Sequence, residues 1–405
     1  MENAVKSRLQ SVQFGAVQAY KSIAIVTLIA PADGIFQYRT LGEALATWDI
    51  AITEISAAGS VPELMVVNRA NKPVLLIDGE ELAGAKQNRV LNTSILLKEV
   101  SETKIPVSCT EQGRWSYAST AFSESGNVMA YKSRSKKTRS VQCSLEASGA
   151  YHSDQGEVWD GIAELQAKAG APSPTSAMSD VYKAREDDLR QCDELFKPLA
   201  NQVGLLAIVD GRPVGVDMVS LTAAYAKLHP KLVRSYTLEG LLDPKGKPAP
   251  PDAIARAKEF LAEIVAAEER QFPSLGHGTD HRYKGNALAG TALVHENEVI
   301  HAAFFRLDEA AQPDTMASLR NRRRHYRDSH SPLGTTTDRN RRKICQARGT
   351  GSEVHQTQAR FPPAGEPAGQ DSALRRRTNR EGLRKTDAAV SLQRLPPRAV
   401  RHPEL

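Results

Sequence analysis

The residue types best suited to chemistry gather in one stretch of the sequence, from Lys72 to Trp115. A short apolar run ends there in the turn dipeptide Asp78-Gly79, and two further apolar runs follow it. The polar groups among these runs are carboxylates, amides, guanidinium groups and a thiol: Glu80, Glu81, Gln87, Asn88, Arg89, Cys109, Glu111 and Arg114. Such groups can bind polar ligands or move protons when apolar strands hold them. We therefore expect the functional site in this stretch.

Glu80, Glu111 and Cys109 are the candidate catalytic residues. Successive strand residues point to opposite faces, so only one of Glu80 and Glu81 can enter a given site. A carboxylate there could act as general acid or base, and the alternative is a solvated or salt-bridged carboxylate. Cys109 could be a nucleophile if a nearby cation lowered the pKa of its thiol. Residues 1–151 contain no histidine to activate it, so we prefer a buried, inert thiol.

Gln87, Asn88, Arg89, Arg114 and Trp115 are the candidate ligand-binding residues. The amides could form hydrogen bonds with hydroxyl or amide groups of a ligand, and the arginines could bind its phosphate or carboxylate through two parallel hydrogen bonds. The alternative is a structural network that braces the sheet, because buried amides and guanidinium groups need polar partners. Trp115 could stack on a base or a sugar, or belong to the core. A small polar or anionic ligand is therefore the expected partner.

Three glycines, Gly79, Gly84 and Gly113, accompany these side chains as structural positions, at turns or where other groups approach the backbone closely. The first two do not make a phosphate-binding loop, because Lys-Ser or Lys-Thr does not follow Gly84. His277 and His281 have the H-x-x-x-H spacing, but neighbouring glycines indicate a loop rather than a metal-binding helix. The sequence therefore predicts no metal site, and it names no cofactor.

Strands must position these residues. Short apolar runs rich in β-branched residues indicate strands at residues 23–29, 50–55, 64–67, 74–77, 90–97 and 105–109. The connections between them are too short for a parallel crossover, which needs about a dozen residues. We therefore expect mostly antiparallel pairing over residues 20–115. Thr40 and Glu43 have the spacing of a capping box, which predicts one helix within this part.

The remainder of the chain alternates helical and hairpin patterns. Residues 116–150 are polar and weakly periodic, so we expect a solvated loop, with a mobile basic lid over the site as the alternative. The predicted elements after it are helices at 154–170, at 175–198, up to about 242 and from 252, and hairpins at 204–219 and 287–305. The expected fold class is α+β: an N-terminal antiparallel β-rich sheet or sandwich packed with several amphipathic helices, a C-terminal hairpin and a disordered tail.

Charge is divided unevenly along the chain. Residues 310–405 hold 20 Lys and Arg against 9 Asp and Glu, which leaves 33 against 38 before them. The net charge of +6 therefore comes from the tail, and the preceding residues give no electrostatic reason to expect nucleic acid or an anionic membrane. The four cysteines are widely spaced, and no run approaches the roughly 18 apolar residues of a membrane span. We expect a cytoplasmic protein with no membrane partner.

The tail, residues 326–405, lacks the apolar residues to bury a core, so we expect it to be disordered. Of the 20 basic residues after position 309, 18 are Arg, which would suit nucleic-acid phosphates. Translation of GC-rich DNA in a wrong frame gives the same composition, and both explanations stay open. If the tail binds nucleic acid, truncation after residue 325 should abolish that binding in a gel-shift assay, and unchanged binding would exclude the tail.

Two segments, LLIDGEELAGAKQNRVLN and IPVSCTEQGRW, resemble the motifs of the ARPP domain family, the bacterial ARG and rhodanese-phosphatase-superfamily-associated protein domain. Further matches extend the resemblance over residues 10–325, with helices and hairpins over 151–308 and the tail outside it. The family name implies a setting in nucleotide- or ADP-ribose-linked metabolism. The resemblance thus implies an enzyme acting on a nucleotide-, ADP-ribose- or sugar-phosphate-like molecule, or else a non-catalytic ligand-binding or scaffold module. It assigns no role to the motif residues.

Overall fold

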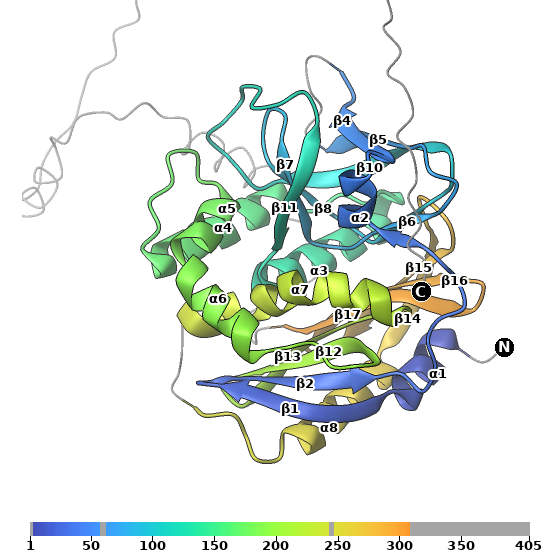
Figure 1. Cartoon of the computed structure of the whole chain (residues 1–405), viewed down its shortest axis with the longest axis vertical. Coiled ribbons are helices and arrows are strands. Elements are labelled where there is room, and N and C mark those ends of the chain that lie inside the picture. Colours follow the sequence, from blue (N-terminus) through green and yellow to red (C-terminus); the bar gives the residue numbers. More distant parts are fainter. Residues whose placement is uncertain (1–2, 57–61, 243–246, 308–405) are drawn as a thin grey trace, which may run out of the picture. The chain divides into compact units, whose positions relative to one another are not determined.

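The computed structural model describes residues 3–56, 62–242 and 247–307. In these ranges eight helices surround two large sheets and one small sheet (Figure 1). The predicted α+β class is confirmed, and strand pairing is antiparallel except for one short parallel pair. The tail expected at residues 326–405 lies outside the described residues.

The larger sheet has eight antiparallel strands in the order β1-β2-β12-β13-β17-β16-β15-β14. Their bounds are β1 Gln13–Tyr20, β2 Ile23–Ile29, β12 Gln202–Val209, β13 Arg212–Val219, β14 Glu268–Pro273, β15 Thr279–Gly285, β16 Leu288–His295 and β17 Glu298–Arg306. Alternate residues of β2 enter two different cores, with Ile23 and Ile25 in one and Ala24 and Val26 in the other. The sheet is therefore covered on both faces.

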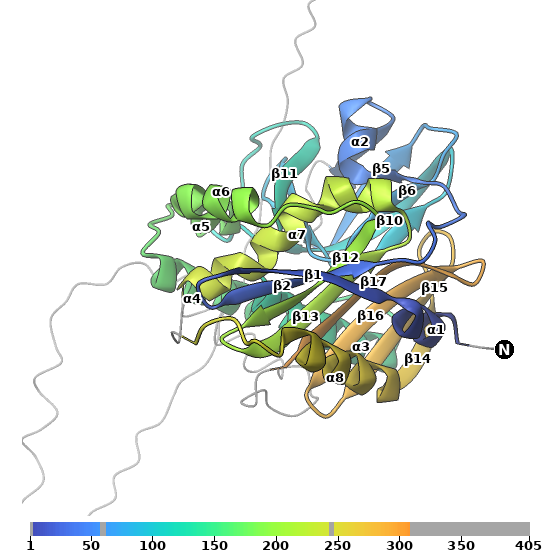
Figure 2. The same cartoon turned by 60° about the horizontal axis from the view of Figure 1, so that its bottom comes forward.

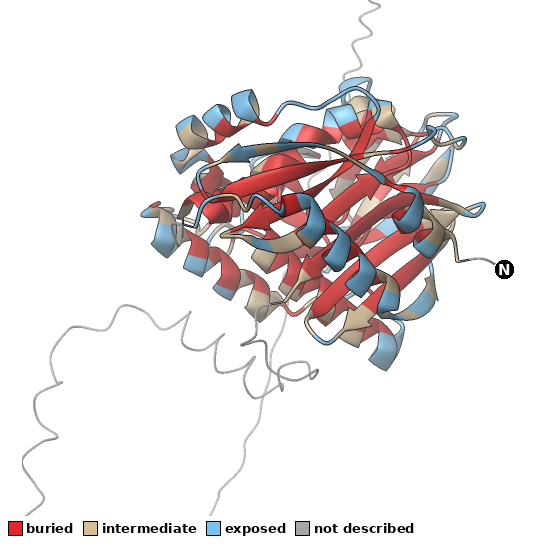
Figure 3. Ribbon diagram, turned by 90° about the horizontal axis from the view of Figure 1, so that it is seen from below, coloured by how far each residue is buried: buried red, intermediate tan, exposed pale blue. Residues whose placement is uncertain are grey.

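Helices cover the two faces of this sheet. On one face lie α1 (Ala4–Ser11) and α8 (Ala253–Ala266), and on the other lie α3 (Tyr131–Ser148) and α7 (Thr222–Leu242) (Figure 2). Figure 3 shows the helices on the near face exposed on their outer sides and the strands behind them buried. The apolar stripe of α8, which includes Phe260, belongs to the core beneath it, so the amphipathic helix predicted there is confirmed.

A second layer of strands holds the motif stretch. It consists of a six-stranded sheet, β11-β7-β8-β10-β5-β4, and a three-stranded sheet, β3-β6-β9. Their bounds are β3 Arg39–Thr40, β4 Ile50–Glu54, β5 Glu63–Asn68, β6 Val74–Leu76, β7 Glu80–Gly84, β8 Arg89–Leu91, β9 Ile95–Leu97, β10 Ser101–Cys109 and β11 Phe122–Val128. A third core, which includes Leu82 and Leu91, fills this layer. Helix α2 (Leu41–Ala46) starts with the capping box predicted from Thr40 and Glu43.

The loop predicted at residues 116–150 is wrong, because this segment forms β11 and α3. Helix α3 is buried between the two layers, and its Arg134 and Lys137 are only 0% and 1% exposed. The sequence pattern was misleading for a physical reason. A helix that buries charged side chains lacks the apolar stripe by which amphipathic helices are recognised.

Other elements match or refine the predictions. Helix α4 (Gln155–Ala169) starts at its predicted cap, Asp154, and both predicted hairpins form, as β12–β13 and β16–β17. The single helix expected at 175–198 is two helices, α5 (Met178–Ala184) and α6 (Glu186–Leu195). The short helices expected before residue 242 are one long helix, α7. Strands β1, β14 and β15 were not predicted.

Helix α3 joins the two layers through completely buried charges. Arg134 donates from Nη1 and Nη2 to the carboxylate of Asp217 on β13, at 2.9 and 2.8 Å, and from Nε to Asp78, at 3.1 Å. Lys137 donates to Asp78 and to the carbonyl oxygen of Leu91. Burial alone would raise the pKa of Asp78, but Lys137 and Arg134 outweigh it and lower that pKa. The turn that begins β7 is therefore tied to the larger sheet.

Replacing Arg134 by methionine tests this connection. Arg134→Met leaves Asp78 and Asp217 buried without the guanidinium group, and removing one partner of a buried pair costs about 3–5 kcal/mol. We expect urea titration to show a fall of about this size in the free energy of unfolding. Arg190→Met is the control, because the Arg190 side chain is 62% exposed, and it should leave the unfolding midpoint unchanged. An Arg134→Met protein as stable as the wild type would contradict this role.

Candidate functional site

Within the motif stretch, β7, β8 and β10 are neighbouring strands of the six-stranded sheet, so the polar residues near them divide between its two faces. Arg89 points to the same face as Leu91, which belongs to the third core. Glu81 pairs with Val90, and both point to the opposite face, toward the helices. The structure therefore separates the sequence-predicted residues into two groups instead of bringing them all to one place.

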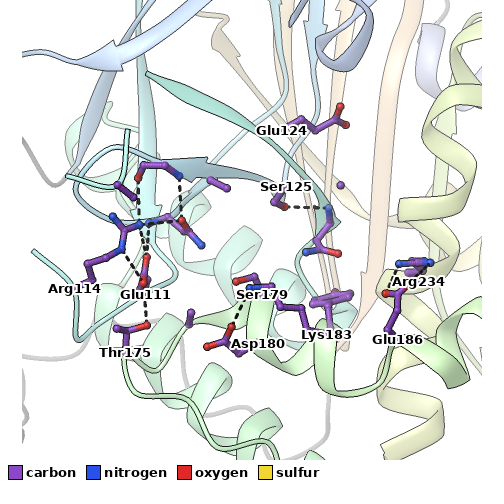
Figure 4. Close-up of a pocket in the computed structure, with 18 residues that line it drawn as sticks. Glu111, Arg114, Glu124, Ser125, Thr175, Ser179, Asp180, Lys183, Glu186 and Arg234 are labelled. Atoms are coloured by element: carbon purple, nitrogen blue, oxygen red, sulfur yellow. Dashed lines mark hydrogen bonds and ion pairs between the residues drawn. The ribbon is translucent and has the colours of Figure 1, made fainter. Parts of the chain in front are cut away.

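A pocket of about 570 Å³ lies between the second layer and helices α5, α6 and α7 (Figure 4). Of the sequence-predicted residues, Gly84, Asn88, Glu111 and Arg114 line it. Much of the remaining lining is polar, and sequence reasoning had not assigned it to the site: Ser125, Asn127, Thr175, Ser179, Asp180, Lys183, Glu186 and Arg234. The sequence offered one signal for this wall, because residues 174–178, which include Thr175, are among the further matches to the family motifs, but the resemblance assigned them no role.

Arg114 fixes one wall of the pocket. Its acceptors are Glu111 Oε1 and Oε2 at 2.9 and 2.6 Å, Asn88 Oδ1 at 3.2 Å, and the carbonyl oxygens of Gly84, Ala85 and Ser116 at 3.3, 2.7 and 2.9 Å. Each nitrogen of the guanidinium group thus donates to the protein itself. Arg114 braces the wall and has no donor to spare for an anion.

Glu111 is the acidic partner in this wall. Its carboxylate also accepts hydrogen bonds from the backbone N–H of Asn88, at 3.1 Å, and from Thr175 Oγ1, at 2.9 Å. Burial would raise the pKa of Glu111, but the hydrogen bonds from Arg114 and Thr175 outweigh this and lower it. The pocket therefore contains an ionised carboxylate at neutral pH.

The helices form the opposite wall, where the charges also neutralise one another. Arg234 of α7 donates to Glu186, at 3.0 Å, and to Asp193, at 2.6 Å. Asp180 accepts from Lys183 at 3.3 Å, and the Lys183 side chain is 75% exposed. The wall thus presents the Ser179 hydroxyl group, paired charges and the exposed ammonium group of Lys183.

Glu81 lies completely buried behind the pocket. It accepts hydrogen bonds from Thr110 at 2.8 Å and from Asn127 Nδ2 at 3.4 Å. Burial raises the pKa of Glu81 by more than these hydrogen bonds lower it. Glu81 therefore binds a proton more readily than an exposed glutamate, and Asn127 connects it to the pocket.

Glu80 is also completely buried, and it does not line the pocket. Its carboxylate pairs with Lys231 of α7, which in turn pairs with Glu124 of β11. Burial raises the pKa of Glu80. Glu124 does line the pocket, and Figure 4 shows it apart from Glu111. Glu80 is thus connected to the pocket only through this chain of ion pairs.

Arg89, Cys109 and Gln87 form the second group, on the face of the third core. Arg89 Nη1 donates to Gln87 Oε1 at 2.9 Å and to Cys109 Sγ at 2.8 Å. Burial raises the pKa of Cys109 to about 11, so its thiol stays protonated at neutral pH. Trp115 lies over Arg89, with its ring centroid 6.0 Å from Cζ, and is half exposed. Cys109 is therefore not activated as a nucleophile.

The motif glycines shape the backbone around both groups. Gly79 and Gly84 have φ angles of +83° and +126°, which residues with side chains disfavour. Gly113 packs directly on the backbone of Thr175, where a Cβ atom would lie 2.9 Å from the Thr175 Cα. The close approach at Gly113 brings Thr175 beside Glu111.

Within residues 3–56, 62–242 and 247–307, no group of three or more His, Cys, Asp or Glu side chains is placed to hold a metal ion. His277 and His281 have separate carboxylate partners, Glu99 at 2.9 Å and Glu269 at 2.8 Å. No helix in these ranges is long and apolar enough to cross a membrane.

These features define an α+β domain with a polar pocket where its second strand layer meets three helices. A family model, described as the ARG and Rhodanese-Phosphatase-superfamily-associated Protein domain, matches residues 11–305. The chain belongs to this family, as its two motifs predicted. Comparison with curated proteins and with solved structures found no match.

The substitution Glu81→Gln tests the raised pKa of the Glu81 carboxyl group behind the pocket. Because the pKa of Glu81 is raised above 4.5 on folding, this group stabilises the fold below pH 4.5, and that contribution is lost as the pH rises through the folded pKa. We expect urea titrations from pH 4.5 upward to show the wild type losing stability relative to Glu81→Gln. Glu296→Gln, at a position 73% exposed, should follow the wild-type profile. Parallel profiles for wild type and Glu81→Gln would refute the assignment.

Proposed function

We propose that this domain binds a small polar metabolite in the pocket, of the nucleotide, ADP-ribose or sugar-phosphate kind. The observation that carries the proposal is the convergence of Ser125, Asn127, Thr175 and Ser179 on one pocket of about 570 Å³. These hydroxyl and amide groups can both donate and accept hydrogen bonds, as recognition of a hydroxyl-bearing ligand requires. The volume falls within the range of about 300–1,000 Å³ that small-molecule sites occupy.

The charges of the pocket support recognition through hydroxyl and amide groups rather than through an arginine clamp. Arg114 and Arg234 are each bound to carboxylates of the pocket wall. Lys183 has an exposed side chain and lies among the lining residues. We assign any phosphate group of the ligand to Lys183, because an ammonium group binds phosphate as a point charge without a fixed geometry.

Ligand binding is better supported than catalysis. Of the three candidate catalytic residues, Glu111 lines the pocket, whereas Glu80 is paired with Lys231 in the interior and the Cys109 thiol is protonated. An enzyme built on this site would use the ionised Glu111 as its base, with Glu81, whose pKa burial raises, behind it. Gln87 and Arg89 would then have no direct part, because they lie on the other face of the sheet.

The setting of the domain is consistent with small-molecule metabolism. The family description associates the domain with a rhodanese-phosphatase superfamily. Cys109 and Cys192 are free thiols, which agrees with the reducing cytoplasmic location that we propose. Nucleic-acid binding through the tail stays a prediction, because the tail lies outside the described residues.

A thermal-shift panel of AMP, ADP-ribose, ribose and ribose 5-phosphate tests the proposal. A ligand at 100 times its Kd stabilises the folded state by about 2.7 kcal/mol, so at least one panel member should raise the Tm measurably. Asn127→Ala should abolish the shift, because the Asn127 side chain lines the pocket. Gln271→Ala, at an exposed position of β14, should preserve it.

The same panel distinguishes the role of Lys183. Lys183→Ala should weaken the response to ribose 5-phosphate and leave the response to ribose unchanged. A Tm that no panel member changes would overturn the proposed ligand class. Turnover of a bound panel member that Glu111→Gln abolishes would establish the enzymatic version instead.

A further inference from the structure

Glu54 and Arg89 are buried together, and several of their polar atoms have no hydrogen-bond partner among the described residues. Arg89 is 0% exposed, and the Glu54 side chain is 4% exposed. Among the described residues, both carboxylate oxygens of Glu54 and the Nε and Nη2 atoms of Arg89 lack a hydrogen bond. The distance from Nη2 to Glu54 Oε1 is 3.8 Å, too long for a hydrogen bond. Because buried polar groups are almost always satisfied, four such atoms in one place indicate that a bridging group belongs between them.

The fold brings these two side chains together from separate strands. Glu54 is the last residue of β4, at the edge of the six-stranded sheet, and Arg89 is the first residue of β8, in its interior. Arg89 shares a face with Leu91 of the third core, whereas its neighbour Asn88 lines the pocket. The pair therefore lies on the opposite face of the strand from the pocket and forms a separate feature.

The orientation of Arg89 is fixed by its other contacts. Its Nη1 atom donates to Gln87 Oε1 and to Cys109 Sγ, and the Cys109 thiol donates to Gln87 Oε1 at 3.1 Å. The Nε and Nη2 atoms form a different edge of the planar guanidinium group, and two parallel N–H groups point from that edge. Gln87 and Cys109 thus position Arg89 with its two-donor edge available.

One hydroxyl oxygen can satisfy an arginine and a carboxylate at the same time. It accepts a hydrogen bond from the arginine and donates its own hydrogen to the carboxylate. An oxygen about 2.8 Å from each partner spans a gap of this length. Two hydroxyl groups on adjacent carbons would meet both free nitrogens of Arg89 and both oxygens of Glu54. A charged ligand would be repelled by one partner, so a neutral diol suits the pair best.

Trp115 adds an aromatic ring beside Arg89. Its ring lies over the Arg89 guanidinium group and is 51% exposed, so it is an aromatic surface between Arg89 and solvent. Lys86 holds this ring and that of Tyr117, with its Nζ atom 5.3 and 5.2 Å from the two centroids. A half-exposed, fixed aromatic face can pack against the C–H groups of a sugar ring.

We propose that Glu54, Arg89 and Trp115 form a second binding site, which takes the vicinal diol of a ribose or another sugar. Glu54 and Arg89 bind the two hydroxyl groups, and Trp115 moves aside to admit the sugar and then packs on its ring. The site stands on its own contacts and does not depend on the function proposed for the pocket.

Two methyl glycosides test the site on the full-length protein. Methyl β-D-ribofuranoside has a 2,3-diol, and methyl 2-deoxy-β-D-ribofuranoside lacks it. We expect the first to bind about tenfold or more tightly in ligand-observed NMR titrations, because the deoxy sugar leaves charged partners without hydrogen bonds. The first should also change the tryptophan fluorescence. This comparison needs no mutation, so it holds even if a variant fails to fold.

Variants then locate the site. Glu54→Gln should abolish the preference for the diol, and Trp115→Phe should abolish the fluorescence change. Trp48→Phe is the matched control, because Trp48 is 85% exposed and has no part in the site, and it should retain that change. Equal affinity for the two glycosides, or binding of neither, would overturn the proposal and indicate that a water molecule bridges Glu54 and Arg89. Equal affinity leaves the pocket proposal untouched, since Glu54 does not line the pocket, whereas binding of neither glycoside would also count against ribose recognition in the pocket.

Discussion

The buried guanidinium group of Arg134 is the interaction on which the rest of the structure depends. It binds Asp217 in the larger sheet and Asp78 in the second layer, so one side chain joins the two layers. Charges removed from water are costly, and they are tolerated only where each finds its partner with good geometry. Apolar surfaces can slide over one another, whereas this pairing is satisfied in one arrangement. The position of α3, and of the turn that begins β7, follows from it.

Buried pairing also explains why the Lys72–Trp115 stretch is so polar for a segment of strands. Asp78 and Glu80 receive cations from α3 and α7, and these contacts hold the second layer against helices that come later in the chain. The residues at strand ends, such as Asn88 and Glu111, are the ones that reach the pocket. The motif therefore combines two roles: its strand interiors bind helices, and its ends build a wall of the pocket.

Local patterns in the sequence were sufficient for those elements that a short apolar run or a helix cap marks. The fully buried strand β12 and the capping box at Thr40 are of this kind. Helix α3 was missed because its buried Arg134 has partners 56 and 83 residues away, and no local pattern records a distant partner. Only some of the residues that line the pocket were predicted, for the same reason. Its strand wall comes from the motif, but its helix wall comes from segments that only the folded chain brings close.

Strands β2 and β12 are neighbours in the larger sheet, yet residues 30–201 separate them in the sequence. The whole second layer, together with helices α3 to α6, is thus inserted between two paired strands. The chain must lose the entropy of closing this long loop before the contacts between β2 and β12 stabilise the fold, and this slows folding. During synthesis the β1–β2 hairpin leaves the ribosome long before β12 is made. The two apolar faces of β2 then remain uncovered, so this strand is a part of the chain that needs a chaperone.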